Sequence, residues 1–182
     1  MALRIYGNRQ LKTVPGPATR PTTGRVREAL FNIWHDSIEA CSWLDLCAGN
    51  GVMGAEALCR GATTVLGIEK SSLACRTIRQ NWQPIVQPHQ TARVICGDVL
   101  AWLPKLAQQR FQHIYFDPPY QSGLYQPVLA AIAQYRLLNP DGELAVEHEV
   151  ETWQATPVPE LELQRQKHYG RTSLTFYKLQ NV

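Results

Sequence analysis

The chain has 182 residues, of which 45% are hydrophobic and 18% are charged. This length suits one domain of ordinary size and excludes a multidomain assembly. Its apolar stretches fall short of the ~20 residues that a membrane helix needs, and its first residues lack the apolar block of a secretion signal. We therefore expect a cytoplasmic protein without a membrane partner. The five cysteines form no Cys-x-x-Cys pair, which favours reduced thiols and no bound metal.

Charge is distributed unevenly along the chain. Residues 1–27 contain six Lys and Arg residues and no acid, whereas the rest contains 12 basic and 15 acidic residues, which gives +6 against −3. We divide the chain into a basic N-terminal arm at 1–24 and a single domain at 25–182. The arm shows little periodicity, which is typical of an extended segment along a polyanion or of a solvated tail.

After the arm, strand-like and helical patterns alternate. An amphipathic helix is predicted to run from the N-cap candidates Thr22 and Thr23 to about Ser37. The predicted strands are 43–47, 65–68, 93–96, 113–116, 143–147, 161–167 and 173–179, and the later helices are 53–60, 71–82, 99–107 and part of 125–138. Apolar strands of this kind predict a parallel sheet covered on both faces. The last two strands lack a helix between them and are predicted to form an antiparallel hairpin through Tyr169 and Gly170.

The carboxyl ends of parallel strands are where ligands bind in such sheets. The first predicted strand contains Asp45 and leads into Gly49, Gly51 and Gly54 at the spacing Gly-x-Gly-x-x-Gly. This spacing lets the backbone approach a ligand, although it also occurs in turns that bind nothing. A carboxylate repels phosphate and attracts a cation, so Asp45 favours an ammonium group such as that of S-adenosylmethionine. A bulky residue at Gly51 is expected to close the space over this ligand and to leave the fold intact.

Two further acids end the next two strands. Glu69 can accept both hydroxyls of an adenosine ribose, or it can be a surface residue beside Lys70. Asp98 can accept from an adenine amino group while the N–H of Val99 donates to the ring, or it can cap the following helix. Acids at the ends of three successive strands outline a nucleoside with an amino acid tail.

The fourth strand ends in Asp117-Pro118-Pro119-Tyr120. The prolines fix the backbone, so the Pro118 carbonyl cannot turn away. If Asp117 and this carbonyl accept the two hydrogens of an exocyclic amino group, its nitrogen lone pair can face a methyl donor while Tyr120 stacks on the base. The alternative is a rigid turn with a core tyrosine.

The order of these motifs resembles the class I S-adenosylmethionine-dependent methyltransferases, and residues 117–120 look like the signature of those that methylate base amino groups. Residues 20–31, 45–62 and 169–172 resemble the RsmD family. This resemblance implies a Rossmann-like fold with a seven-stranded, mostly parallel sheet. It also implies methylation of guanine N2 in 16S ribosomal RNA, either naked or in a small-subunit assembly particle, by a protein that we expect to be a monomer.

The resemblance also implies a role for each site residue. Asp45, Gly49 and Gly51 hold the methionine end of the cofactor, Glu69 the ribose, and Asp98 with Val99 the adenine. Asp117, Pro118 and Tyr120 are the catalytic residues, and Pro119 and Tyr120 contact the target base. Arg20, Arg25 and Arg27 bind RNA phosphates through their planar guanidinium groups. The sequence departs from the family pattern at Gly24, where an acid is expected, and at Cys47 and Asn50 in the glycine loop.

Two alternatives remain open from the sequence. A DNA adenine-N6 or cytosine-N4 methyltransferase uses the same tetrapeptide, but it usually needs a further base-recognition domain for which 182 residues leave little room. A non-enzymatic, cofactor-binding RNA chaperone or assembly factor would bind RNA through the basic arm, and methyl transfer would be incidental. The histidines lack ligand spacing, and Glu147, Glu149 and Glu151 are interpreted as a solvated face at a strand edge.

Overall fold

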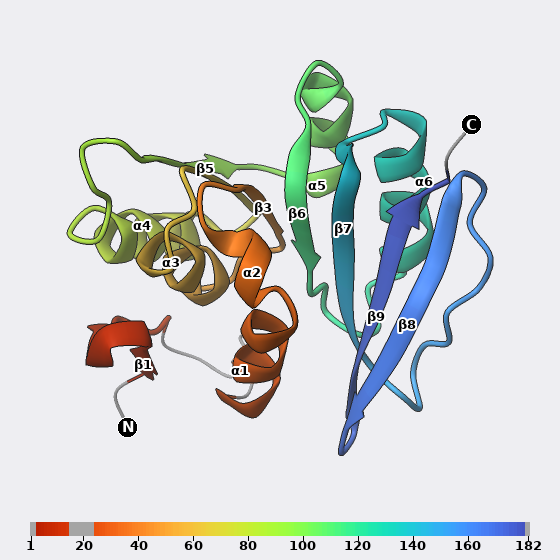
Figure 1. The fold of residues 1–182 in the computed structure, drawn as a ribbon, viewed down its shortest axis with the longest axis horizontal. Coiled ribbons are helices and arrows are strands. Elements are labelled where there is room, and N and C mark those ends of the chain that lie inside the picture. The colour runs from red at the N-terminus through yellow and green to blue at the C-terminus, as the bar shows by residue number, and fades with distance from the viewer. Residues whose placement is uncertain (1–2, 15–23, 181–182) are drawn as a thin grey trace.

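The computed structural model describes residues 3–14 and 24–180, and a seven-stranded sheet of order β5-β4-β3-β6-β7-β9-β8 lies at its centre (Figure 1). The strands are β3 (Ser42–Leu46), β4 (Thr64–Glu69), β5 (Thr91–Cys96), β6 (Phe111–Phe116), β7 (Leu138–Glu149), β8 (Leu161–Tyr169) and β9 (Thr172–Leu179). The first five are parallel, and β9 pairs antiparallel with both β7 and β8. The predicted mostly parallel sheet with an antiparallel C-terminal hairpin is confirmed.

Helices cover both faces of the sheet (Figure 1). One face carries α1 (Gly24–Ile33), α2 (His35–Ile38), α3 (Val52–Cys59) and α4 (Ser72–Trp82), and the other carries α5 (Val99–Trp102), the 3-10 helix η2 (Leu103–Leu106) and α6 (Tyr125–Gln134). Neighbouring residues of a strand enter opposite cores, as Trp43 and Leu44 of β3 do. Among the described residues, no helix combines the length and apolarity needed to cross a membrane.

The interpretation of the arm as an extended segment is wrong for residues 3–11. They form a small antiparallel hairpin of β1 (Leu3–Ile5), the 3-10 turn η1 (Tyr6–Asn8) and β2 (Arg9–Leu11). Ile5 and Leu11 are buried in the same core as α1 and α3. Lys12 then exchanges two backbone hydrogen bonds with the side chain of Asn81, at 2.9 and 3.0 Å. The beginning of the arm is therefore part of the folded structure.

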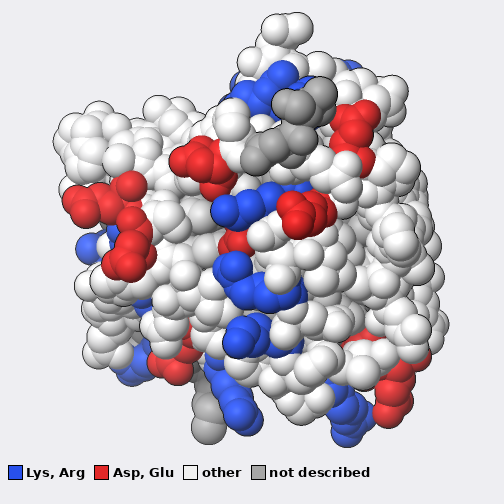
Figure 2. Space-filling model, turned by 45° about the vertical axis from the view of Figure 1, so that its right-hand side comes forward, with Lys and Arg blue, Asp and Glu red and all other residues white. Residues whose placement is uncertain are grey.

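Basic side chains lie on the hairpin of β8 and β9 at one edge of the sheet. Figure 2 shows a column of Lys and Arg side chains down the face that includes this side of the molecule, with acidic side chains next to it. By strand register, Arg165 and Lys167 of β8 lie opposite Phe176 and Leu174, so they share a face of the hairpin with Lys178 of β9. We call Arg165, Lys167 and Lys178 the basic column. Charged side chains of this kind also protect an edge strand from pairing with another chain.

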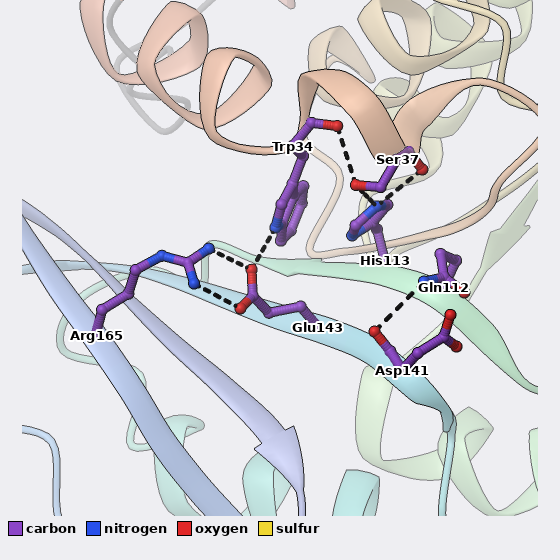
Figure 3. Close-up of polar contacts among 7 residues, drawn as sticks. All are labelled: Trp34, Ser37, Gln112, His113, Asp141, Glu143 and Arg165. Carbon is purple, nitrogen blue, oxygen red and sulfur yellow. Dashed lines mark hydrogen bonds and ion pairs between the residues drawn. The ribbon is translucent and has the colours of Figure 1, made fainter.

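The helix predicted to run to Ser37 is interrupted at Trp34, which separates α1 from α2. The Trp34 ring stacks on His113 at 4.2 Å, and its indole N–H donates to Glu143 at 2.5 Å (Figure 3). Arg165 donates two further hydrogen bonds to Glu143, at 2.9 and 2.6 Å. These contacts fasten the α1–α2 junction to β6, β7 and β8, and they explain why the helix breaks there. The predicted caps Thr22 and Thr23 lie outside the described residues.

Candidate active site

A cavity of about 700 Å³ lies at the carboxyl ends of β3, β4, β5 and β6. Strand order reverses between β3 and β6, which is the position where sheets of this type bind ligands. The predicted residues that line it are Asp45, Gly49, Glu69, Asp98, Val99, Asp117, Pro118, Pro119 and Tyr120. The structure thus brings together every predicted cofactor and base residue except Gly51.

Asp45 is the buried acid of this cavity. It lies near the end of β3, and its Oδ2 accepts a hydrogen bond from the N–H of Gly54 at 3.1 Å. Burial raises the pKa of Asp45 to about 7; the Gly54 N–H opposes this shift, and the charge of Glu69 adds to it. A cation bound beside Asp45 would relieve the cost of its buried charge, so the position suits an ammonium group.

The glycines of the turn after β3 differ in what a side chain at each position would contact. Gly49 has a φ of +57°, nothing lies within 4 Å of the position a Cβ would take, and the residue lines the cavity. At Gly51, with a φ of +74°, a Cβ would lie 2.8 Å from Nε1 of Trp82 and 2.9 Å from Ile78. The same Trp82 Nε1 donates to the Gly51 carbonyl at 2.8 Å.

The expectation for Gly51 is therefore wrong. A side chain there would collide with α4 inside the core and would not close the space over a ligand. Gly54 confirms the pattern, because its Cβ would lie only 2.4 Å from the Trp82 ring. Two of the three glycines in the Gly-x-Gly-x-x-Gly spacing thus make room for the indole of Trp82.

Glu69 and Asp98 both have local structural contacts as well as a place in the cavity. Glu69 accepts from the N–H of Gly49 at 2.8 Å and from the N–H of Ser71 at 2.8 Å, so it is more than a surface residue beside Lys70. Asp98 caps α5 by accepting from the N–H of Leu100 at 3.0 Å, as the alternative interpretation expected. A carboxylate oxygen has two lone pairs, so these contacts leave room for ligand hydroxyl or amino donors.

Residues 117–120 follow β6 without a break. The N–H of Asp117 donates to the Leu46 carbonyl at 3.4 Å, which ties the tetrapeptide to the end of β3. Pro118 is buried, whereas Asp117 and Tyr120 are half-buried and line the cavity. A carboxylate, a fixed carbonyl and an aromatic ring are thus available to a flat, amino-bearing group that enters the cavity.

Glu147 and Tyr115 are cavity residues that the sequence interpretation missed. Glu147 lies on β7 with only 3% of its surface exposed, and it accepts a hydrogen bond from the hydroxyl of Tyr115. Its interpretation as part of a solvated face is wrong, because β7 is an internal strand of the sheet. The sequence did contain a signal for Glu147, because this acid lies within a predicted strand of a sheet that was expected to be covered on both faces.

The predicted phosphate-binding arginines do not share one environment. Arg20 lies outside the described residues, and Arg25 is exposed on the first turn of α1. Arg27 is buried, lies 3.4 Å from Oε2 of Glu56, and donates to the Arg4 carbonyl at 2.7 Å. The assignment of Arg27 to RNA is therefore wrong: it faces α3 and fastens the N-terminal hairpin to the core.

The chain is similar to known proteins over nearly its whole length. A family model described as "Conserved hypothetical protein 95" matches residues 3–178. The "Putative rRNA methyltransferase YlbH" of Bacillus subtilis (strain 168) is 33% identical over 172 residues, which cover 93% of each chain. The "Ribosomal RNA small subunit methyltransferase D" of Escherichia coli (strain K12) is 31% identical over 182 residues, which cover 97% of this chain and 89% of that one. The solved structure "Putative methyltransferase yhhF from Escherichia coli" has a TM-score of 0.81 at 30% identity and covers 98% of each chain.

Proposed function

The chain belongs to the conserved hypothetical protein 95 family, and on that premise we propose that it transfers a methyl group from S-adenosylmethionine to the N2 amino group of a guanine in 16S ribosomal RNA. The resemblance to the RsmD family that the motifs indicated is confirmed by relatives named as ribosomal RNA methyltransferases. Those names support methylation of ribosomal RNA. The choice of guanine N2 rests on the site.

The observation that carries this proposal is the position of residues 117–120. They form the rim of the same cavity that Asp45, Glu69 and Asp98 line from three neighbouring strands. The three acids provide acceptors for the ammonium, ribose and adenine groups of the cofactor. The tetrapeptide then holds a base amino group within the same space, which is what a direct transfer requires.

The residues of the chain have distinct tasks in this reaction. S-Adenosylmethionine supplies an electrophilic methyl group bound to a positively charged sulfur. Asp117 and the Pro118 carbonyl accept the two hydrogens of the amino group, so its lone pair points at the methyl carbon. With the cofactor bound, the amino nitrogen would take the methyl group, the sulfur would keep the electron pair of the broken carbon–sulfur bond, and the Asp117 carboxylate would accept the proton that the nitrogen releases. Tyr120 stacks on the base and holds it in place.

Two surfaces support an RNA substrate. Val14, at the end of the described part of the arm, lines the cavity, so the basic arm reaches the site. Thr172 of β9 also lines the cavity, and it stands two residues from Leu174, which lies opposite Lys167 of the basic column. By strand register, the basic column thus leads along the hairpin toward the cavity. Lys and Arg side chains neutralise phosphates without regard to sequence, as a large RNA substrate requires.

The test is to incubate the protein with labelled S-adenosylmethionine and with naked 16S RNA, small-subunit particles or DNA, and then to identify the methylated nucleoside. We expect N2-methylguanosine from one of the two RNA substrates. N6-Methyladenine or N4-methylcytosine would contradict the proposal and support the DNA-type alternatives, whereas RNA binding without methylation would support an assembly factor. Asp117→Ala is the control, and we expect it to slow single-turnover methylation by about 10² to 10³, with cofactor affinity unchanged.

A further inference from the structure

Glu147 has no role in the cofactor and amino-group contacts described above, although it is a buried carboxylate inside the cavity. It comes from β7, the strand beside β6, and the hydroxyl of Tyr115 donates to it. Burying a carboxylate is costly unless hydrogen bonds or charges compensate it. Because Glu147 lines the cavity, its carboxylate can also accept a hydrogen bond from a ligand that enters.

Glu147 and Asp117 each follow the last paired residues of β7 and β6, which are Val146 and Phe116. Tyr115 and Phe116 of β6 lie opposite Ala145 and Val146 of β7, so Asp117 and Glu147 are the next residues on two parallel neighbours. Neighbouring strands are about 4.8 Å apart, and residues opposite each other project from the same face. Both residues line the cavity. Two carboxylates that follow this paired segment on neighbouring strands thus line the same cavity.

Bases differ in what lies next to their amino group. In guanine, the ring nitrogen N1 beside the N2 amino group carries a hydrogen and is a donor. In adenine and cytosine, the ring nitrogen beside the amino group is an acceptor. An ionised carboxylate only accepts hydrogen bonds. A carboxylate next to the amino-group site therefore fits guanine and repels the lone pair of the other two bases.

We propose that Glu147 accepts the N1–H of the target guanine while Asp117 orients its N2 amino group, so that Glu147 selects guanine over other amino-bearing bases. Tyr115 is a positioning residue, because its hydroxyl holds the carboxylate at the cavity wall. This inference rests on the proposed function and identifies the base that the site accepts. Sites that hydrogen-bond a substrate donor can reject analogues lacking it by factors of about 10⁴, because a buried polar group is left unpaired.

The test compares RNA with guanine and RNA with 2-aminopurine at the position that the nucleoside experiment identifies. 2-Aminopurine keeps the amino group at C2, but its N1 is an acceptor. In single-turnover reactions we expect the unaltered protein to prefer guanine by at least about 100-fold. Glu147→Gln provides an amide that can donate to that acceptor, so we expect this preference to fall about tenfold or more. Tyr115→Phe should lower it less.

Glu149→Gln is the matched control. Glu149 lies on the same strand, is half-buried and does not line the cavity, so we expect its replacement to leave the preference unchanged. Because 2-aminopurine also lacks the O6 atom of guanine, the comparison between the Glu147 and Glu149 variants isolates the N1 contact. Cofactor affinity, measured by calorimetry, should be the same in all variants.

Several results would overturn the inference. One is equal methylation of both bases by the unaltered protein, which needs no variant and so cannot be attributed to misfolding. Another is a Glu147→Gln protein that binds cofactor and keeps the full preference for guanine. If the unaltered protein methylates no guanine N2 in any substrate, the proposed function itself fails, and the nucleoside analysis reports that separately.

Discussion

Two buried glutamates stand on the same face of β7, four residues apart, and they belong to regions with different purposes. Glu143 lies toward the amino end of the parallel strands, where Arg165 and the Trp34 indole donate to both of its oxygens (Figure 3). Glu147 lies at the carboxyl end, where it accepts from Tyr115 and faces the cavity. A buried carboxylate that forms an ion pair within the core can stabilise the tertiary structure, whereas a carboxylate that faces a cavity can bind a ligand.

The largest expected effect is on stability, and it tests whether the Glu143–Arg165 ion pair stabilises the fold. Arg165→Ala leaves Glu143, which is 5% exposed, without its cation, and removes the guanidinium that lies 4.4 Å from the Phe176 ring. Because Arg165 is itself about a third exposed, we expect the free energy of unfolding to fall by roughly 2–4 kcal/mol. Denaturant unfolding measures this, with the exposed Lys167→Ala as the control. A loss below about 0.5 kcal/mol would show that the pair is no more than a surface ion pair.

Gly49 and Gly51 allow a residue that lines the cavity to be compared with one that packs in the core. Gly51→Ala should destabilise the protein by about 1–3 kcal/mol, because its Cβ meets Trp82 and its φ is positive. Gly49→Ala has the same backbone strain but open space around its Cβ, so we expect a smaller loss of stability and weaker cofactor binding. Thermal unfolding and calorimetry on both variants separate the two effects. Equal effects of the two replacements on cofactor affinity would contradict this division.

The raised pKa of Asp45 predicts how cofactor binding depends on pH. Only the ionised carboxyl attracts an ammonium group, and its pKa is about 7, so affinity should rise up to tenfold per pH unit below pH 7 and level off above it. Calorimetry from pH 5.5 to 8.5 measures this, and Asp45→Asn should remove the dependence. An affinity of the unaltered protein that does not vary over this range would contradict the role of Asp45.

The raised pKa of Asp45 has the opposite effect on the stability of the cofactor-free protein, which should fall as the pH rises. The folded Asp45 keeps its proton up to about pH 7, whereas the ordinary value is 3.8, so the folded state binds more protons between these values. The contribution of this group to the free energy of unfolding therefore falls as the pH rises through that range. Denaturant unfolding at several pH values measures this, and the free energy of unfolding of Asp45→Asn should lack this pH-dependent contribution.

The smallest expected effect concerns the basic column. RNA affinity should decrease with salt, with a log–log slope of about −0.7 to −0.9 for each phosphate neutralised. Replacing Lys167 and Lys178 together by Ala should reduce the magnitude of that slope by about 1 to 2 and leave cofactor affinity unchanged. Filter binding at several salt concentrations measures this. An unchanged slope would assign the column to protection of the sheet edge alone.

The sequence by itself determined the architecture and most of the cavity. Strand-like and helical periods alternate along the chain, and both depend on residues close in sequence. Asp45, Glu69 and Asp98 end or nearly end three successive strands and residues 117–120 follow a fourth, so parallel pairing alone brings them to one edge. Contiguous motifs on predictable elements were therefore sufficient for these residues.

Only the tertiary structure decided the contacts between distant segments. The Trp34–Glu143 bond joins residues 109 positions apart, and the Tyr115–Glu147 bond joins residues 32 apart. Strand register and the rotation of a helix about its axis set such pairs, and a shift of one residue would send each side chain to the opposite face. Arg27 and Gly51 are further examples of such contacts. Arg27 is buried against Glu56 of α3, and the absence of a side chain at Gly51 leaves room for Trp82 of α4. In each case the partner lies on another element, which the local sequence around Arg27 or Gly51 does not specify.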